Sequence, residues 1–399
     1  MSIDLGSVRA DTPGCENVLH LNNAGASLPT SIVLERVKAH LDLEAEIGGY
    51  EAADRTAEEY ERVYARIARM LGCAVEEIAL VESATQAWDS AFYALAQRFE
   101  PGDKILTASN EYVSNYLAFL QVARQRGAEV IVIPSEATGE VSLALLEQAI
   151  AQHGKRVKVI AMTHVPTNGG LIQPAAQVGG IARAHGIPFL LDACQSAGQM
   201  PLRVAELGCD MLSATGRKYL RAPRGTGFLY VRQGLLEQLE PAAIDMRSAV
   251  WNSRNGYELC KDARRFETWE SSVACRLGLG VAVEYAMAVG LDNIAARVFL
   301  LGGQLRQRLA RIRGVTVRDL PGSCSQACCG IVTFTHDRHT AQAIFERMRD
   351  QRINVRVTAA GSTRIDMEQR GLTEMVRASV HYYNTEEELE RFAEAIADL

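Results

Sequence analysis

The sequence lacks the features that place a protein in a membrane or on nucleic acid. No run of about 18 uninterrupted apolar residues occurs, so we expect no membrane-spanning helix. The first residues show no basic stretch followed by an apolar one, which is the pattern of a secretory signal. No Lys/Arg-rich run occurs and the formal net charge is −6, so we expect neither nucleic acid nor an anionic membrane surface as a partner.

Cysteine is sparse and irregularly placed. Nine cysteines, an odd number, are scattered through 399 residues, which argues against a disulfide framework and favours a reducing, cytoplasmic compartment. Cys324, Cys328 and Cys329 cluster, but no second CxxC or HxxxH pair completes a zinc site, so we expect no metal. No cysteine follows Cys329 in the chain.

Short apolar runs alternate with helical patterns from about residue 60 to residue 240. The helical patterns often end at glycine, as helices do. Continuous apolar strands separated by helices are typical of a mostly parallel sheet that helices cover on both faces. We expect buried strands at 104–109, 129–134, 157–164, 187–193, 211–215 and 227–231.

The pattern changes from about residue 275. A long helical stretch is followed by strand-like runs at 314–322, 329–335 and 354–359, separated by further helices. This part is interpreted as a smaller α+β domain, and the chain length suits two domains. We predict a large domain at 21–274, with 1–20 and 275–399 forming the small one.

Polar residues follow the predicted strands where each strand ends. Open parallel sheets bind ligands at this edge. Each residue alone has an ordinary interpretation as a helix cap, a packing residue or a surface charge. They are Thr85, Tyr112, Thr167, Asn168, Asp192, Gln195 and Lys218.

As a set, these residues match the needs of one cofactor, pyridoxal 5′-phosphate (PLP). PLP requires a lysine for its Schiff base and an acid beside its pyridinium nitrogen. It also needs an anion site, which a helix that opens at Thr85 provides, and a flat side chain against its ring. We therefore expect PLP as the cofactor and Lys218 as the residue that bonds to it.

The segment "LLDACQSAGQMPLRVAELGCDMLSATGRKYLRAPRGTGFLYV" resembles the core of the class V aminotransferase family of fold-type I PLP enzymes. "LNNAGASLP" near the start and "RASVHYYNTEEEL" near the end fit the same family. The family includes cysteine desulfurases, isopenicillin N epimerase-like proteins and ergothioneine-pathway C–S lyases. The resemblance implies an α/β fold with a mostly parallel, seven-stranded type of sheet between helices, a smaller α+β C-terminal domain, and a homodimer.

The resemblance implies a role for each residue near the cofactor. Lys218 would bond to the cofactor and shuttle the proton, while Asp192 would keep the ring nitrogen protonated. Tyr112 would stack on the ring, and Gln195 would contact its phenolic oxygen with Thr167 or Asn168 nearby. The residues implied at the phosphate are Ala84, Thr85, Thr215 and Arg217, with Ser271 as a candidate from the partner chain.

Arg377 stands where the family binds the α-carboxylate of the substrate. A planar guanidinium suits a two-pronged carboxylate contact. Asn22, Ala24 and Gly25 form a turn that would close over the substrate. Arg364 is a further candidate, either for a second anionic group of the substrate or as a solvated loop charge.

The reaction is harder to assign. Cysteine desulfurases of this family use a mobile nucleophilic cysteine upstream of the carboxylate-binding arginine. The equivalent place is near Ser362, and serine cannot hold a persulfide, so desulfuration by that route is disfavoured.

The segment 362–372 resembles the C–S lyase and epimerase-like branch instead. We therefore expect a lyase that acts by β-elimination on a cysteine S-conjugate or its sulfoxide, similar to hercynylcysteine sulfoxide lyase, and that releases pyruvate and ammonia. The alternatives are an isopenicillin N epimerase-like racemase or epimerase and an aminotransferase. A non-catalytic PLP-binding protein is not expected, because Lys218, Asp192 and Arg377 are all present.

Overall fold

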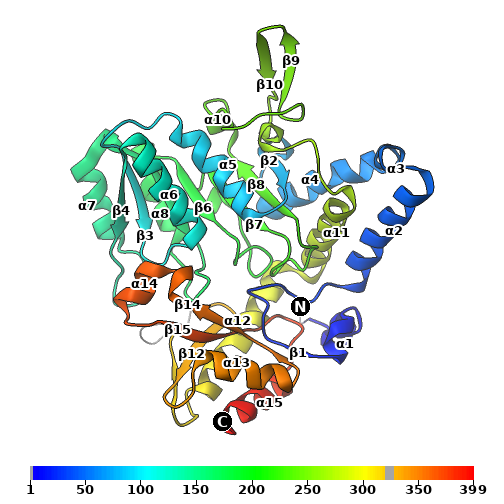
Figure 1. The fold of residues 1–399 in the computed structure, drawn as a ribbon, viewed down its shortest axis with the longest axis vertical. Coiled ribbons are helices and arrows are strands. Elements are labelled where there is room, and N and C mark those ends of the chain that lie inside the picture. The colour runs from blue at the N-terminus through cyan, green and yellow to red at the C-terminus, as the bar shows by residue number, and fades with distance from the viewer. Residues whose placement is uncertain (1–2, 320–327) are drawn as a thin grey trace.

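The computed structural model describes residues 3–319 and 328–399, and Figure 1 shows their fold. A seven-stranded sheet with the order β2-β8-β7-β6-β5-β3-β4 forms the centre of the larger part. Only β8 runs antiparallel to its neighbours. Its strands are β2 (Ile78–Val81), β3 (Lys104–Ala108), β4 (Glu129–Ile133), β5 (Val157–Thr163), β6 (Phe189–Asp192), β7 (Met211–Thr215) and β8 (Gly227–Val231).

These strands are apolar because both faces of the sheet are covered. In β2, Ile78 and Leu80 join one hydrophobic core while Ala79 and Val81 join another, as the two-residue period of a strand requires. On the second face lie α5 (Ala84–Ala96) and α6 (Val113–Arg126), and on the first lie α4 (Ala57–Leu71), α8 (Ala175–His185) and α11 (Val273–Val289). This arrangement is the mostly parallel α/β sheet expected from the sequence.

A second, four-stranded antiparallel sheet lies in the C-terminal part, with the order β11-β12-β15-β14. The N-terminal segment also joins this part, because β1 (Leu19–His20) pairs in parallel with β13 (Ile353–Asn354). The domain division at residues 20/21 and 274/275 stays a prediction. The strands and helices of this part are β11 (Val315–Val317), β12 (Ile331–His336), β14 (Arg356–Ala359), β15 (Glu374–Ser379), α12 (Leu291–Leu309), α13 (Ala341–Asp350), α14 (Arg364–Gln369) and α15 (Glu386–Ala397).

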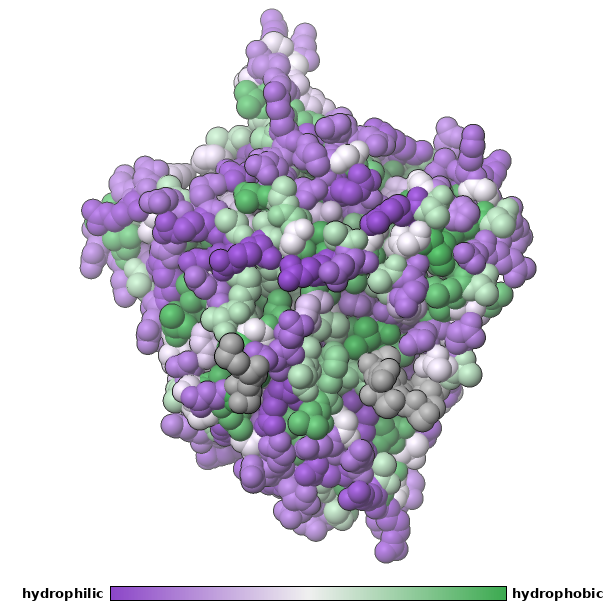
Figure 2. All heavy atoms as spheres, turned by 180° about the vertical axis from the view of Figure 1, so that it is seen from behind, coloured by the Kyte–Doolittle hydropathy of each residue, from purple (hydrophilic) through white to green (hydrophobic). Residues whose placement is uncertain are grey.

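A β-hairpin made of β9 (Ala249–Ser253) and β10 (Gly256–Leu259) stands clear of the rest of the molecule in both views (Figure 1; Figure 2). Its side chains are unusually exposed for their type, with Trp251 79% and Val250 63% accessible. The remaining helices and short turns are α1 (Leu5–Ala10), η1 (Pro13–Glu16), α2 (Ser31–Ile47), α3 (Gly49–Arg55), η2 (Val75–Glu77), α7 (Leu143–His153), η3 (Gly154–Arg156), α9 (Val204–Leu207), α10 (Gln233–Leu236), η4 (Ala263–Phe266) and η5 (Ala360–Ser362).

Within residues 3–319 and 328–399, no single helix is long and apolar enough to cross a bilayer, and one bent pair, α11 with α12, reaches that length and composition together.

Candidate active site

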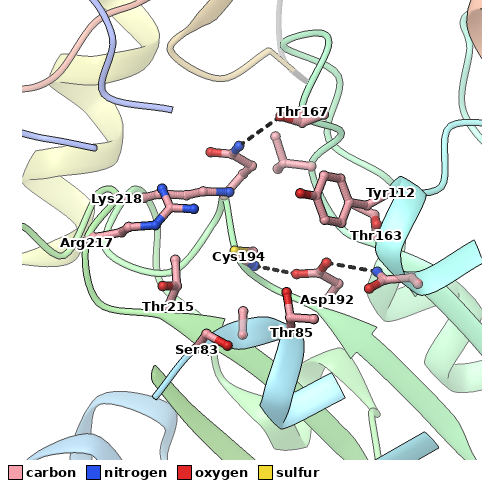
Figure 3. Close-up of a pocket in the computed structure, with 14 residues that line it drawn as sticks. Ser83, Thr85, Tyr112, Thr163, Thr167, Asp192, Cys194, Thr215, Arg217 and Lys218 are labelled. Carbon is pink, nitrogen blue, oxygen red and sulfur yellow. Dashed lines mark hydrogen bonds between the residues drawn. The ribbon is translucent and has the colours of Figure 1, made fainter. Parts of the chain in front are cut away.

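The carboxyl ends of the central strands surround a pocket (Figure 3). Most of the residues predicted at the cofactor line this pocket, although they come from five separate stretches of chain. They are Ala84, Thr85, Tyr112, Thr167, Asp192, Gln195, Thr215, Arg217 and Lys218.

One end of the pocket is the first turn of α5. Ser83 caps this helix by accepting a hydrogen bond from Gln86 N at 3.1 Å, and the next two residues, Ala84 and Thr85, line the pocket. Backbone amides in the first turn have no partner within their helix, so they are suited to bind a phosphate. Gly227 allows this approach, because a Cβ there would lie 2.9 Å from Ser83 C and 3.1 Å from Ala84 N.

Asp192 is the last residue of β6 and lies at the base of the pocket. Its Oδ1 accepts a hydrogen bond from Cys194 N at 2.8 Å, and its Oδ2 accepts one from Asn115 Nδ2 at 2.9 Å. Burial raises the pKa of Asp192, while these two donors and the charge of Lys218 act in the opposite direction. A positively charged ring nitrogen would also act to lower the pKa of Asp192, so the carboxylate suits a pyridinium partner.

Lys218 and Tyr112 approach the pocket from different elements. Lys218 follows β7, is only 8% exposed, and its amine contacts the Cys194 thiol. Tyr112 is the N-cap residue of α6, and Figure 3 shows its ring across the pocket from Lys218. The space between them is bounded by an amine on one side and an aromatic face on the other, which fits a flat cofactor with an aldehyde.

Gln195 leaves a polar atom for a ligand. Its Nε2 donates to Ala24 O at 3.1 Å and to Thr167 Oγ1 at 3.4 Å. Its Oε1 is buried and has no hydrogen-bond partner among the described residues. A buried polar atom without a partner is costly, so this orphaned group indicates that the pocket is built around a polar ligand.

Arg377, on β15, reaches the same region from the second sheet. Its Nη1 donates to Thr167 O at 3.0 Å and to Thr167 Oγ1 at 2.8 Å, and its Nη2 donates to Asn22 Oδ1 at 3.4 Å. All three acceptors are neutral, and its buried Nε has no partner in the described parts of the chain. Burial lowers the pKa of Arg377 to about 10, so the guanidinium is still charged at neutral pH and is available to an anionic substrate group.

The predicted turn at 22–25 lies beside these residues. Ala24 O accepts the bond from Gln195, and Gly25 O accepts one from the Arg217 guanidinium. Ser379, two residues beyond Arg377 on β15, pairs with Asn22, and its Oγ accepts a hydrogen bond from Ala24 N at 2.9 Å and donates to Leu21 O at 3.4 Å. The turn is therefore held between the two sheets at the edge of the pocket.

Seven predicted residues do not line the pocket itself. Asn22, Ala24, Gly25 and Arg377 lie beside it, and Asn168 donates from Nδ2 to Asp366 Oδ2 at 2.7 Å. Arg364 is on the surface, with its side chain 69% accessible and paired with Glu368 at 2.9 Å. Ser271 lies between η4 and α11 and does not line the pocket of its own chain, so its contribution to a partner chain stays a prediction.

Five residues that sequence reasoning missed also line the pocket. Asn115 had a usable signal, since it stands three residues after Tyr112 on a predicted helix and therefore faces the same way. Cys194 lies between two predicted residues, and Ser83 directly precedes Ala84. The missed residues are Ser83, Asn115, Thr163, Val165 and Cys194.

Residues 3–319 and 328–399 contain no group of three or more His, Cys, Asp or Glu side chains that could hold a metal ion. Of the cysteine cluster noted in the sequence, Cys324 lies outside the described residues, and Cys329 is buried. The free thiols are those of Cys15, Cys73, Cys194, Cys209, Cys260, Cys275 and Cys329.

An amine, a carboxylate, an aromatic ring and a helix N-terminus around one pocket at the edge of this sheet define a fold-type I PLP enzyme. Comparison with known families gives the same answer, because the profile of the Aminotransferase class-V family matches residues 18–392. The protein belongs to this family, whose cofactor is PLP.

The similarity to known proteins extends over nearly the whole chain. A protein of Methanothermobacter thermautotrophicus named a probable cysteine desulfurase is 26% identical, with 98% of this chain and 97% of that protein covered. The apo structure of a cysteine desulfurase from Thermococcus onnurineus NA1 has a TM-score of 0.90 at 27% identity, covering 100% and 98% of the two chains. A C-DES variant with glycine covalently linked to its PLP cofactor shares the fold, with a TM-score of 0.86 at 22% identity over 98% and 99%.

These comparisons confirm the family and correct the expected reaction. The expected hercynylcysteine sulfoxide lyase-like β-elimination, with the epimerase-like and aminotransferase alternatives, is wrong, because the relatives are named cysteine desulfurases. The inference gave one position too much weight. It required the sulfur-accepting thiol to stand near Ser362, whereas a thiol can also reach a substrate from another molecule.

Proposed function

We propose that this protein is a PLP-dependent enzyme that removes sulfur from L-cysteine and leaves L-alanine. The proposal is supported by the names of the relatives and by one observation in the site. Lys218 and Asp192 line one pocket, and Thr167 connects that pocket to the guanidinium of Arg377. A proton-transfer group, an acid for the ring nitrogen and a carboxylate-binding group thus meet, as an α-amino acid substrate requires.

The residues would hold the cofactor and substrate as follows. PLP supplies an electron sink that makes the α-proton of a bound amino acid acidic. Lys218 Nζ takes the proton from Cα and returns protons to the carbon skeleton, since its amine is the basic group facing the cofactor. Asp192 holds the ring nitrogen, and the first-turn amides of α5 with Thr85 and Thr215 hold the phosphate.

Arg377 binds the substrate carboxylate. Its guanidinium is already oriented by Thr167 and Asn22, so little side-chain freedom is lost when substrate binds. The charge-assisted hydrogen bonds to a carboxylate are stronger than those to its present neutral acceptors. This arrangement explains why a fully buried arginine has an unpartnered Nε.

The sulfur needs a thiol acceptor, and within residues 3–319 and 328–399 the pocket lining offers only Cys194. The segment between β14 and α14, residues 360–363, contains no cysteine. Cys194 lines the pocket, but burial raises the pKa of its thiol, and a protonated thiol is a weak nucleophile. We therefore assign the acceptor role to a thiol from solution.

A dithiol such as dithiothreitol satisfies the balance of this reaction. L-Cysteine and the reduced dithiol give L-alanine, sulfide and the oxidised dithiol. The Cβ–S bond breaks, one S–S bond forms in the dithiol, and the two electrons and two protons that the dithiol loses appear in alanine and hydrogen sulfide.

The test is product analysis. PLP-loaded enzyme is incubated with L-cysteine and dithiothreitol, and alanine, sulfide and pyruvate are measured. We expect alanine and sulfide in equal amounts, with a rate that rises with dithiol concentration. Pyruvate in place of alanine would contradict the proposal, and enzyme with Lys218→Ala is the control for cofactor chemistry in solution.

The assembly proposed for this enzyme is a homodimer in which the segment 245–271 contacts the partner. Val250 and Trp251 on the projecting hairpin are exposed, and so are Met246 at 69% and Trp269 at 49%. Asp245 Oδ2 accepts a hydrogen bond from Trp269 N at 2.8 Å, which holds both ends of this segment together. Exposed apolar side chains gathered on one segment mark an interaction surface.

Analytical ultracentrifugation tests the dimer. The native chain should sediment as a dimer, and Trp251→Glu should shift it toward monomer because it places a charge in the contact. Leu117→Glu is the matched control, since Leu117 is 58% exposed on α6, outside the segment. A monomeric native chain, or an equal effect of both variants, would refute the proposed interface.

A further inference from the structure

A second buried carboxylate, that of Glu111, lies behind the pocket in the loop after β3. It is 3% exposed and accepts hydrogen bonds on both oxygens. Its Oε1 accepts from Tyr112 N at 2.8 Å, Asn115 Nδ2 at 2.8 Å and Thr163 Oγ1 at 2.5 Å. Its Oε2 accepts from Thr163 N at 3.0 Å and Thr107 Oγ1 at 3.1 Å. Five hydrogen-bond donors thus surround this one buried carboxylate, and together they fix its position.

One of these donors connects Glu111 to the cofactor site. Asn115 Nδ2 donates to Glu111 Oε1 at 2.8 Å and also to Asp192 Oδ2 at 2.9 Å. An amide nitrogen carries two hydrogens, so both are used. The two carboxylates also fix the orientation of the amide, because a flipped Asn115 would direct its oxygen at two acceptors.

We propose that Glu111 is a positioning residue for the cofactor, which acts through Asn115 to hold the Asp192 carboxylate in the orientation that binds the ring nitrogen of PLP. Asn115 is 2% exposed, so no water competes for its two bonds. If the Glu111 oxygen that accepts from Asn115 is removed, the Asn115 amide can rotate. Its hydrogen bond to Asp192 is then no longer held in place.

Glu111 also bonds to the residue on the other side of the site. Its Oε1 accepts the N–H of Tyr112, which is the N-cap residue of α6 and faces the pocket. The same carboxylate therefore fixes the start of the helix that carries both Tyr112 and Asn115. In this way the ring-nitrogen contact and the aromatic face are set by one side chain that does not line the pocket.

The electrostatic setting supports this link. Burial, with a smaller contribution from the nearby charge of Asp192, raises the pKa of Glu111 to about 7. The carboxyl groups of Glu111 and Asp192 thus lie on either side of Asn115, and their negative charges would repel each other if both were ionised. When the cofactor requires Asp192 to be ionised, Glu111 can hold a proton and relieve the repulsion between the two groups.

The experiment compares Glu111→Ala, Asn115→Ala and the double variant by cofactor binding and by the visible absorption of the PLP-loaded enzyme. Each single change should weaken PLP binding by about 10-fold or more, since one hydrogen bond to a charged group is disturbed. Each should also shift the pH midpoint of the absorption band. The double variant should bind PLP at most about threefold more weakly than the single variant that binds it less tightly, because both changes break the same chain of contacts.

Asp103→Asn is the matched control. Asp103 is a buried carboxylate directly before β3, at the opposite end of the strand that Glu111 follows, and it accepts from Glu100 N at 2.8 Å. This variant should bind PLP as the native protein does, with the native absorption midpoint.

Three outcomes would overturn the proposal. The first is a Glu111→Ala enzyme with native PLP affinity and a native absorption midpoint. The second is a double variant whose loss of affinity equals the product of the single losses. If Glu111→Ala does not fold, Asn115→Ala carries the test, and native cofactor affinity in that variant is the third.

Discussion

Arg377 Nη1 lies 2.8 Å from Thr167 Oγ1, and this hydrogen bond connects the two sheets beside the pocket. Arg377 belongs to β15 of the C-terminal sheet, while Thr167 stands in the loop after β5 of the central sheet. A substrate that binds the guanidinium is thereby placed against the cofactor pocket that Thr167 lines. The position of the substrate depends on how the two parts of the chain are packed.

Replacing Arg377 with Gln should therefore impair substrate binding selectively. We expect kcat/KM for L-cysteine to fall by about 10- to 100-fold, mainly through KM, because a charged hydrogen-bond donor is lost. The PLP absorption spectrum should keep its native form. Arg364→Gln is the control in the same steady-state assay, and a loss as large as that of the Arg377 variant would show that the exposed arginine contacts substrate after all.

Replacing Lys218 with Ala should remove the covalent bond to the cofactor as well as the activity. Borohydride reduction of the native PLP-loaded enzyme should leave the cofactor mass on the peptide that contains Lys218, and the variant should gain no such mass. We expect turnover to fall by at least about 1,000-fold, since both the bond and the proton-transfer group are gone. A variant that keeps activity, or a cofactor mass on another lysine, would contradict the assignment.

The sequence predicted the central sheet and the principal site residues for one physical reason. Strands that are covered on both faces must be apolar along their whole length, and helices with glycine at their ends separate them clearly. The predicted runs 157–164 and 211–215 agree with β5 and β7 to within one residue. Once the strands were placed, the topology brought Asp192 and Lys218 to the same edge, although they are distant from Tyr112 in sequence.

What could not be predicted depends on side-chain direction and on surfaces with no strong pattern. The sequence analysis assigned no role to Glu111, and its burial depends on Thr163 of β5, which only the fold brings close to it. The hairpin at 249–259 was not predicted because most of its residues are exposed on both faces, so apolar and polar residues do not alternate. The reaction was inferred wrongly, because the sequence near Ser362 does not reveal which thiol reaches the substrate.

Glu111 should also affect the pH dependence of stability of the protein without cofactor. Its pKa is raised from 4.5 to about 7 in the folded state, so the folded chain keeps a proton that the unfolded chain has lost between these values. The free energy of unfolding from this group therefore falls as pH rises through that window, and the contribution is fully present only at lower pH.

Glu111→Gln removes this contribution. The difference in free energy of unfolding between the native and variant apoproteins should decrease by on the order of 1 to 3 kcal/mol as pH rises from about 4.5 to about 7. Urea unfolding at several pH values measures it. Asp192, whose pKa burial also raises, is present in both proteins. A difference that is constant with pH, or that grows as pH rises, would show that Glu111 ionises normally.

The phosphate end of the site can be tested without changing any residue that would touch the cofactor. A methyl group at Gly227 would lie 2.7 Å from Ala214 O and 2.9 Å from Ser83 C, so Gly227→Ala must push the first turn of α5 away from β8. The amides of Ala84 and Thr85 move with it. We expect the dissociation constant of PLP to rise by about 10- to 100-fold, as loss of charge-assisted hydrogen bonds would cause.

Pyridoxal, which lacks the phosphate, separates this effect from general damage. Its affinity should be nearly the same for Gly227→Ala and for the native protein, because the lysine, the carboxylate and the ring contacts are untouched. Gly180→Ala on α8, where a methyl group meets nothing within 4 Å, should bind both compounds normally. If Gly227→Ala weakens pyridoxal as much as PLP, the change has distorted the whole pocket. The first turn of α5 would then lose its assignment as the phosphate site.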